Sequence, residues 1–222
     1  MIPLRNFIAG LALLVPLLPV AAQESSQFLP EVDVYYRWQP AVGFWFQAKQ
    51  TREAGDPAQA EFGPSLELYL LKPIWKLNPP QSQPIVFSIG YRYLPSPNGP
   101  PTNRMEPLVT LNLAVKHRFL ISDRNRADLD WQSGSFNWRY RNRLNLGTRL
   151  HIRGYEPQPY VAAEVFYASQ YAKWNDTAIY VGCQFPVSTH VNLEPYYEHQ
   201  NITSKSPNQQ FNQGGLILNL TF

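Results

Sequence analysis

The sequence contains one cysteine, few histidines and, beyond residue 22, no long apolar run. The single cysteine, Cys183, excludes an internal disulfide framework, and no cysteine stands near residue 23, where a lipoprotein anchor would be attached. No stretch after residue 22 approaches the roughly 20 apolar residues that a membrane-spanning helix needs. Any contact with a membrane is therefore expected from strands, a surface helix or an anchor.

The sequence is also poor in charge. Charged residues make up 16% of the chain, and the formal net charge is +3. Domains that bind nucleic acid electrostatically are usually strongly basic, so we expect no nucleic-acid partner. The four histidines are scattered, and Cys183 falls on an apolar strand face, where it behaves as a small hydrophobe. We therefore expect no metal site and no cofactor.

The first residues have the layout of a targeting segment. A basic residue, Arg5, precedes an apolar run from Phe7 to Val20, and small residues follow before a cleavage site expected at Gln23. The run is short for a spanning helix and contains two prolines. We predict a secretory signal peptide over residues 1–22. Residues 23–222 then form a single domain outside the cytoplasm.

Strict alternation of apolar and polar residues dominates residues 23–222, and this pattern is typical of β-strands with two unlike faces. No long helical period appears. Bacterial single-chain barrels have even strand numbers, so we predict about twelve strands, or ten if the first segment does not join the wall. The alternating segments lie near residues 31–38, 41–51, 61–72, 83–94, 104–118, 121–131, 136–150, 158–169, 176–186, 190–201 and 213–222.

Alternation alone does not say which face is inside, but two features place the apolar face outside. The polar face carries long charged side chains in mid-strand, and each would cost about 2 to 4 kcal/mol if it faced lipid at the midplane. The second feature is that ring-bearing residues lie near segment ends, as in the aromatic girdles of membrane barrels: Trp38, Tyr93, Trp131, Phe136, Trp138 and Phe185. We predict an all-β fold, an antiparallel up-and-down transmembrane β-barrel in the outer membrane of a Gram-negative-type bacterium.

The segment GGLILNLTF, which finishes at Phe222, has apolar residues at alternate positions before the final aromatic ring. It resembles the terminal strand of outer-membrane proteins, in which a final aromatic residue serves in recognition by the assembly machinery. We expect Phe222 to be this assembly signal. The expected partners are outer-membrane lipid and the barrel assembly machinery.

The segment DRNRADLDWQSGSFNWRYRNRLNL, Asp123 to Leu146, places five arginines among aromatic rings. Read with a period of two, the arginines share one face and the rings point the other way, which argues against a surface for single-stranded nucleic acid. A turn at Gln132–Ser135 would pair Trp131 with Phe136. In that register two pairs of arginines also lie opposite each other, Arg126 with Arg141 and Arg124 with Arg143.

Like charges directly opposite each other destabilise an isolated hairpin, so carboxylates must come from neighbouring strands. Asp33 and Glu67 are on the correct face to contribute if the sheet closes. The predicted lumen charge network consists of Arg124, Arg126, Asp128, Asp130, Arg139, Arg141, Arg143, Glu164, Glu194 and Glu198.

Several long motifs in the same order resemble the bacterial family catalogued as domain of unknown function 2490. The similarity runs over most of the mature chain, and the family implies an outer-membrane β-barrel. It brings no established activity or substrate, so no catalytic residue is carried over. The motifs are LPEVDVYYRW, SIGYRYLPSPN, SDRNRADLDW, FNWRYRNRLNL, PYVAAEVFY, the KW of YAKWND, EPYYEHQN and GLILNLTF.

Two roles for such a barrel stay open. If the arginines of the network are fully paired, the interior is plugged and the protein is a structural component of the envelope. If the arginines outnumber their partners locally, the barrel is a narrow pore that selects small anionic solutes.

The alternative function is a lipid-acting outer-membrane hydrolase, which would need a serine and a histidine within reach of each other. The best pair is His199 with Ser204 in a loop nearby, and His190 lies two residues from Ser188 at a predicted tight turn. Neither pair has the features of a catalytic site, so we assign no catalytic residues.

Overall fold

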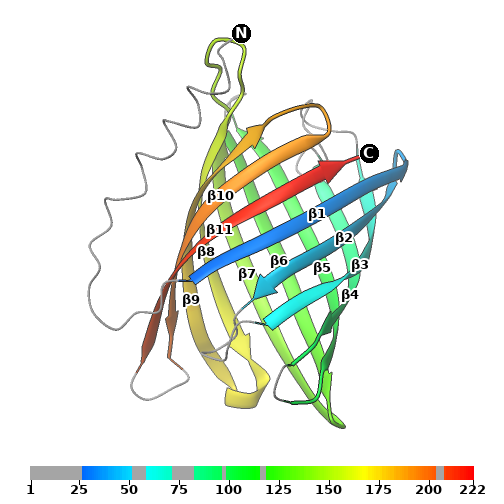
Figure 1. Cartoon of the computed structure of the whole chain (residues 1–222), viewed down its shortest axis with the longest axis vertical. Helices are drawn as coiled ribbons and strands as arrows, with labels where there is room; N and C mark the ends of the chain where they lie inside the picture. Colours follow the sequence, from blue (N-terminus) through cyan, green and yellow to red (C-terminus); the bar gives the residue numbers. More distant parts are fainter. Residues whose placement is uncertain (1–26, 52–58, 72–82, 97–98, 116–118, 204–207) are drawn as a thin grey trace.

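The computed structural model describes residues 27–51, 59–71, 83–96, 99–115, 119–203 and 208–222, which form a closed β-barrel (Figure 1). A short 3-10 turn, η2 (Ser169–Tyr171), follows β8. No helix among the described residues is long and apolar enough to cross a membrane. The strands are β1 (Gln27–Gln39), β2 (Val42–Thr51), β3 (Gln59–Leu70), β4 (Ile85–Leu94), β5 (Thr102–Val115), β6 (Phe119–Gln132), β7 (Ser135–Thr148), β8 (Gln158–Ala168), β9 (Lys173–Pro186), β10 (Val191–Ile202) and β11 (Gln209–Thr221).

Each strand pairs antiparallel with the next along the chain, and a parallel pair between β1 and β11 closes the barrel. In an up-and-down series of eleven strands the first and last run in the same direction, so closure requires one parallel pair. The predicted all-β barrel is confirmed. The eleven strands of the described residues match the eleven alternating segments of the sequence and lie between the predicted twelve and the alternative ten. The predicted signal peptide, residues 1–22, lies outside the described residues.

The β6–β7 hairpin fixes which residues of its two strands face inward. Its two-residue turn has positive φ at both positions, 50° at Ser133 and 80° at Gly134, as a tight turn that matches strand twist requires. The turn pairs Trp131 with Phe136, which is the register predicted from the sequence. Since a slip of one residue would turn every side chain to the other face, this turn determines that the arginines lie inside.

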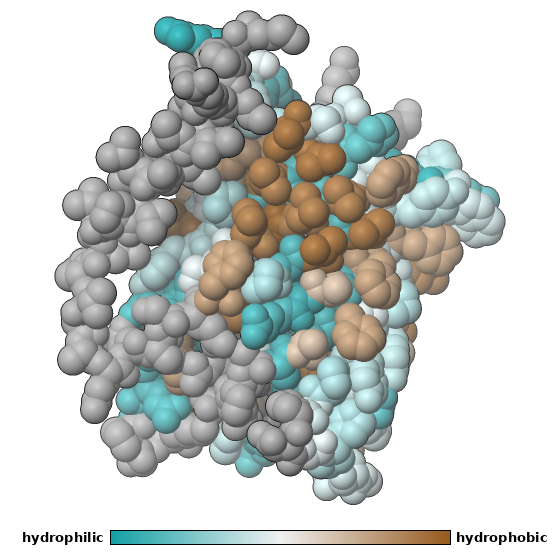
Figure 2. Space-filling view, in the orientation of Figure 1, coloured by the Kyte–Doolittle hydropathy of each residue, from teal (hydrophilic) through white to brown (hydrophobic). Residues whose placement is uncertain are grey.

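Side chains alternate between the barrel interior and its outer surface. Along β3, Glu61 and Glu67 are buried, while Phe62, Leu66 and Leu68 on the outer surface are 38% to 44% exposed. Figure 2 shows apolar side chains gathered into one brown area over the face that β11 and β1 form in Figure 1. An apolar exterior around a polar interior is the reverse of a soluble barrel and is compatible with an outer-membrane barrel.

Candidate functional site

The inner face of β6 and β7 carries a fully buried carboxylate surrounded by arginines. Asp128 on β6 has no exposed surface, and its Oδ2 lies 2.7 Å from Nη2 of Arg139 on β7. Its Oδ1 lies 2.7 Å from Nε of Arg126, and Nη1 of Arg141 is 3.9 Å from Oδ2. One carboxylate therefore faces three guanidinium groups.

Glu164 on β8 is a second buried carboxylate, 1% exposed. Its Oε1 accepts a hydrogen bond from Nε of Arg141 at 2.9 Å, and its Oε2 accepts from Nη2 of Arg143 at 2.6 Å. The hydroxyl of Tyr180 also donates to Oε2 at 2.9 Å, whereas Nη2 of Arg124 is 3.8 Å from Oε1. Because Arg124 and Arg143 are directly opposed in the β6–β7 ladder, Glu164 supplies the negative charge that this like-charged pair needs.

The charge network continues across β4 and β5. Arg104 donates from Nε and Nη2 to the two carboxylate oxygens of Asp130, at 2.6 and 2.8 Å, in the bidentate geometry of strong ion pairs. Nε of Arg92 lies 3.3 Å from Oε2 of Glu106, and the other oxygen of Glu106 lies 3.4 Å from Nη1 of Arg126. The β4 and β5 side chains thereby connect with the arginine row of β6 and β7.

Sequence reasoning missed part of this network. The sequence of β5 could have identified two of these residues. Arg104 and Glu106 stand at even-numbered positions, as do Thr110 and Asn112, which the alternation already assigns to the polar face. The residues absent from the predicted network are Lys49, Glu61, Arg92, Arg104 and Glu106.

Aromatic rings of the adjoining strands β8 and β9 contact the arginines. The Cζ of Arg143 lies 3.9 Å from the ring centroid of Tyr180 on β9, and that of Arg141 lies 4.6 Å from Phe166 on β8. Rings of the hairpin itself, such as Trp138, point outward. The predicted separation of arginine from aromatic rings therefore holds within the hairpin, and the rings that stack on the guanidinium groups come from other strands.

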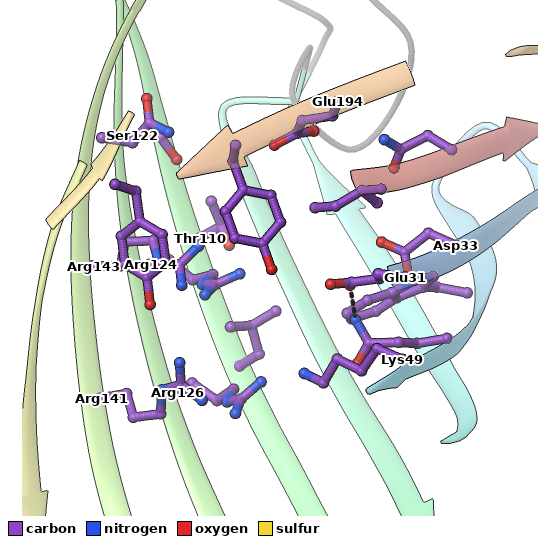
Figure 3. Close-up of a pocket in the computed structure, with 18 of the residues that line it drawn as sticks. Glu31, Asp33, Lys49, Thr110, Ser122, Arg124, Arg126, Arg141, Arg143 and Glu194 are labelled. Atoms are coloured by element: carbon purple, nitrogen blue, oxygen red, sulfur yellow. Dashed lines mark hydrogen bonds between the residues drawn. The ribbon is translucent and has the colours of Figure 1, made fainter. Parts of the chain in front are cut away.

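A cavity of about 300 Å³ lies inside the barrel beside the charge network. Its lining includes Arg124 and Arg143 from the hairpin, Glu31 and Asp33 from β1, and Glu194 from β10. Figure 3 shows these arginines on one side of the cavity, Glu31 and Asp33 with Lys49 on the other, and Glu194 between the two groups at the top of the view. The cavity therefore has one cationic wall and one wall, called the anionic wall below, in which carboxylates outnumber the lysine.

Two predicted members of the network are held by tyrosines. Glu194 accepts from the hydroxyl of Tyr160 at 2.7 Å, and Oε1 of Glu198 lies 2.9 Å from the hydroxyl oxygen of Tyr180, whose single proton it shares with Glu164. Neither carboxylate forms an ion pair with a cation in the part of the chain that the structure describes. The structure groups the predicted hairpin residues with Glu164 and places Glu194 on the anionic wall.

The candidate catalytic pairs lie apart from this interior. Nδ1 of His199 lies 2.8 Å from Oδ1 of Asn212, and Ser204 is outside the described residues. Nδ1 of His190 contacts a backbone carbonyl at 2.7 Å, while Oγ of Ser188 accepts from the His190 backbone N–H and not from its ring. The described ranges contain no group of three or more histidine, cysteine or carboxylate side chains arranged to hold a metal.

Comparison with known proteins gives a family and nothing further. No curated protein matches the chain, and no solved structure matches it. The model of the family described as protein of unknown function DUF2490 matches residues 27–212, and the chain belongs to this family.

Proposed function

We propose that the protein is an outer-membrane β-barrel whose interior is a binding compartment for small polar solutes, and not an open pore. The proposal rests on the pairing of the arginine row. Arg126, Arg139, Arg141 and Arg143 each lie within 3.0 Å of a carboxylate oxygen of Asp128 or Glu164. Guanidinium groups that already donate to carboxylates have fewer free N–H donors to offer a permeating anion.

Burial supports the same conclusion. Arg92, Arg104, Asp128 and Glu164 are at most 1% exposed, which argues against a continuous water path past them. The more exposed arginines of the hairpin, up to 30% at Arg124, line the cavity. The remaining interior space is the cavity of about 300 Å³, which lies at the lower end of the range for ligand pockets. The paired network fills the barrel on one side of the cavity and supports its cationic wall.

The outer surface supports a location in the outer membrane, with lipid as a partner. Large apolar side chains on strands around the barrel face outward, including Phe44 on β2, Ile89 on β4, Leu144 on β7 and Val181 on β9, which are 43% to 53% exposed. Recognition of β11 by the barrel assembly machinery through Phe222 is part of the same proposal. The ring of Phe222 stacks on His190 at 5.9 Å between centroids and remains 61% exposed.

Planar-bilayer recordings test the absence of a pore. The purified protein should give no steady conductance under conditions in which a known porin, reconstituted in parallel, conducts. A variant with Arg126→Ser, Asp128→Ser and Arg139→Ser, which empties part of the network, should conduct if it folds. Steady anion-selective steps from the unaltered protein, lost in Arg141→Glu, would contradict the proposal.

Cell fractionation tests the location. The protein should be found with the outer membrane, and its migration in detergent gels should change on heating, because folded membrane barrels resist dodecyl sulfate until they are heated. Recovery in the soluble periplasmic fraction would contradict the membrane assignment.

A further inference from the structure

The two walls of the cavity carry charges of opposite sign that form no ion pair with each other among the described residues, although Arg143 acts on Glu194 across the cavity at longer range. On the cationic wall, five arginines of β6 and β7 share the carboxylates Asp128 and Glu164, with Glu106 divided between Arg92 and Arg126. Arg124 is the least engaged member, because its contact with Glu164 is 3.8 Å long and its side chain is 30% exposed. The cationic wall therefore has an excess of positive charge that faces the cavity.

The anionic wall has the opposite excess. Oε1 of Glu31 accepts from Nε2 of Gln47 at 2.5 Å, and Glu194 accepts from Tyr160 and Gln184, so the donors are neutral. Within the described ranges no cation forms an ion pair with Glu31, Asp33 or Glu194. Lys49, which lies opposite Glu31 in the β1–β2 ladder and acts on Asp33 at longer range, has its Nζ 3.4 Å from Oε1 of Glu61. Carboxylates that are removed from water without a cation are costly, so this wall would gain from a bound cation.

Asp33 is the clearest sign of a missing partner. Its side chain is 4% exposed, and its Oδ1 has no hydrogen-bond partner. The other oxygen accepts a long bond, 3.4 Å, from the hydroxyl of Tyr35. The indole N–H of Trp45 is close enough to stabilise this carboxylate electrostatically, but it does not have the geometry of a hydrogen bond. Figure 3 shows Asp33 beside Glu31 and across from the arginines.

Aromatic rings complete the anionic wall. Tyr35 and Trp45 stack with their ring centroids 5.9 Å apart and an interplanar angle of 6°, and both line the cavity, as do Tyr160 and Tyr196. The guanidinium of Arg92 already lies over Trp45, with Cζ 4.8 Å from the ring centroid, so the tyrosines are the rings proposed to face the ligand. Carboxylates and ring faces together are the surroundings that bind an ammonium or quaternary ammonium group. Guanidinium groups are the surroundings that bind a carboxylate or a phosphate.

We propose that the cavity binds a small zwitterion, with its ammonium group toward Glu31, Asp33 and Glu194 and its anionic group toward Arg124 and Arg143. An anion alone or a cation alone would neutralise one wall and leave the other unchanged, whereas a zwitterion neutralises both. This inference rests on the proposed function, because a binding compartment is required. A free amino acid and an aminophosphate headgroup share this chemistry.

Isothermal titration calorimetry of the full-length mature protein in non-ionic detergent tests the proposal. The probes are ω-amino acids from glycine to 6-aminohexanoate, which represent free solutes, and phosphoethanolamine, which represents a lipid headgroup. At least one probe should bind about tenfold or more tightly than butyrate and butylamine, since it makes charge-assisted contacts at both walls. Equal binding of butyrate, or no binding of any zwitterion, would overturn the proposal.

Variants locate the binding. Arg124→Gln and Asp33→Asn should each weaken the zwitterion by about tenfold or more, and Glu194→Gln provides a second test of the anionic wall if Asp33→Asn fails to fold. The matched controls, Arg153→Gln and Glu156→Gln, change exposed residues of the β7–β8 connection and should leave binding unchanged. Equal losses in the controls would overturn the assignment of the site.

The two proposals fail in different ways. A barrel that is silent in the bilayer and binds no zwitterion retains the proposed closed interior and loses this ligand class. A barrel that conducts steadily loses the proposed function itself, whatever it binds.

Discussion

Replacing Glu164 by glutamine tests whether the charge network stabilises the barrel. Glu164 accepts hydrogen bonds from Arg141, Arg143 and Tyr180 and is 1% exposed. Glutamine keeps one acceptor oxygen, but its NH2 group can only donate, so one arginine loses its acceptor and all of them lose the charge. Breaking a buried ion pair from one side typically costs about 3 to 5 kcal/mol, because the remaining charge is left uncompensated. We expect a loss of this size in the free energy of unfolding.

The matched control is Glu156→Gln. Glu156 is also paired with an arginine, Arg149 at 3.3 Å, but its side chain is 40% exposed, and exposed pairs contribute about 0 to 1 kcal/mol. Urea unfolding in lipid vesicles, followed by tryptophan fluorescence, measures both variants. Adding Arg143→Met to Glu164→Gln should recover part of the loss, because one uncompensated cation is removed. Equal destabilisation by Glu164→Gln and Glu156→Gln would refute the reasoning.

Two further predictions use the same unfolding measurement. Gly63→Ala should destabilise the barrel by about 1 to 3 kcal/mol or prevent folding, because the added Cβ would lie 2.0 Å from the backbone oxygen of Tyr91. In the control, Gly214→Ala, the added Cβ meets no atom within 4 Å and should have little effect. An unchanged free energy of unfolding in Gly63→Ala would show that the strands can separate there. Val181→Arg, on the outer face of β9, should cost about 2 to 4 kcal/mol if this face lies near the lipid midplane. Ile152→Arg, which is equally exposed but lies in the β7–β8 connection, should cost under about 0.5 kcal/mol, and equal effects of the two arginines would argue that both positions face water.

The sequence predicts the barrel and the hairpin register because both are local properties. Alternation with a period of two identifies each strand, and the Ser133-Gly134 turn determines that Asp128 faces Arg139. Closure is not local, because no pattern within β1 or β11 says that the two strands pair in parallel. The anionic wall also depends on closure, since Asp33 on β1 lies across the cavity from β6 and β7 only once the sheet is joined. Alternation along the sequence therefore identifies the residues that face inward, and only the closed barrel shows which of them lie opposite each other.

The parallel seam between β1 and β11 also has a consequence for folding kinetics. It joins Gln27–Tyr35 with Gln213–Thr221, so its contacts span nearly the whole described chain. Contacts of such sequence separation form late and slowly, and until they form the sheet has two open edges that can pair with other chains. Beyond the ladder, the backbone N–H of Phe222 donates to the carbonyl of Tyr35, and the N–H of Arg37 donates to the carbonyl of Phe222. Formation of this seam is therefore the folding step at which an aggregation-prone open sheet becomes a closed barrel.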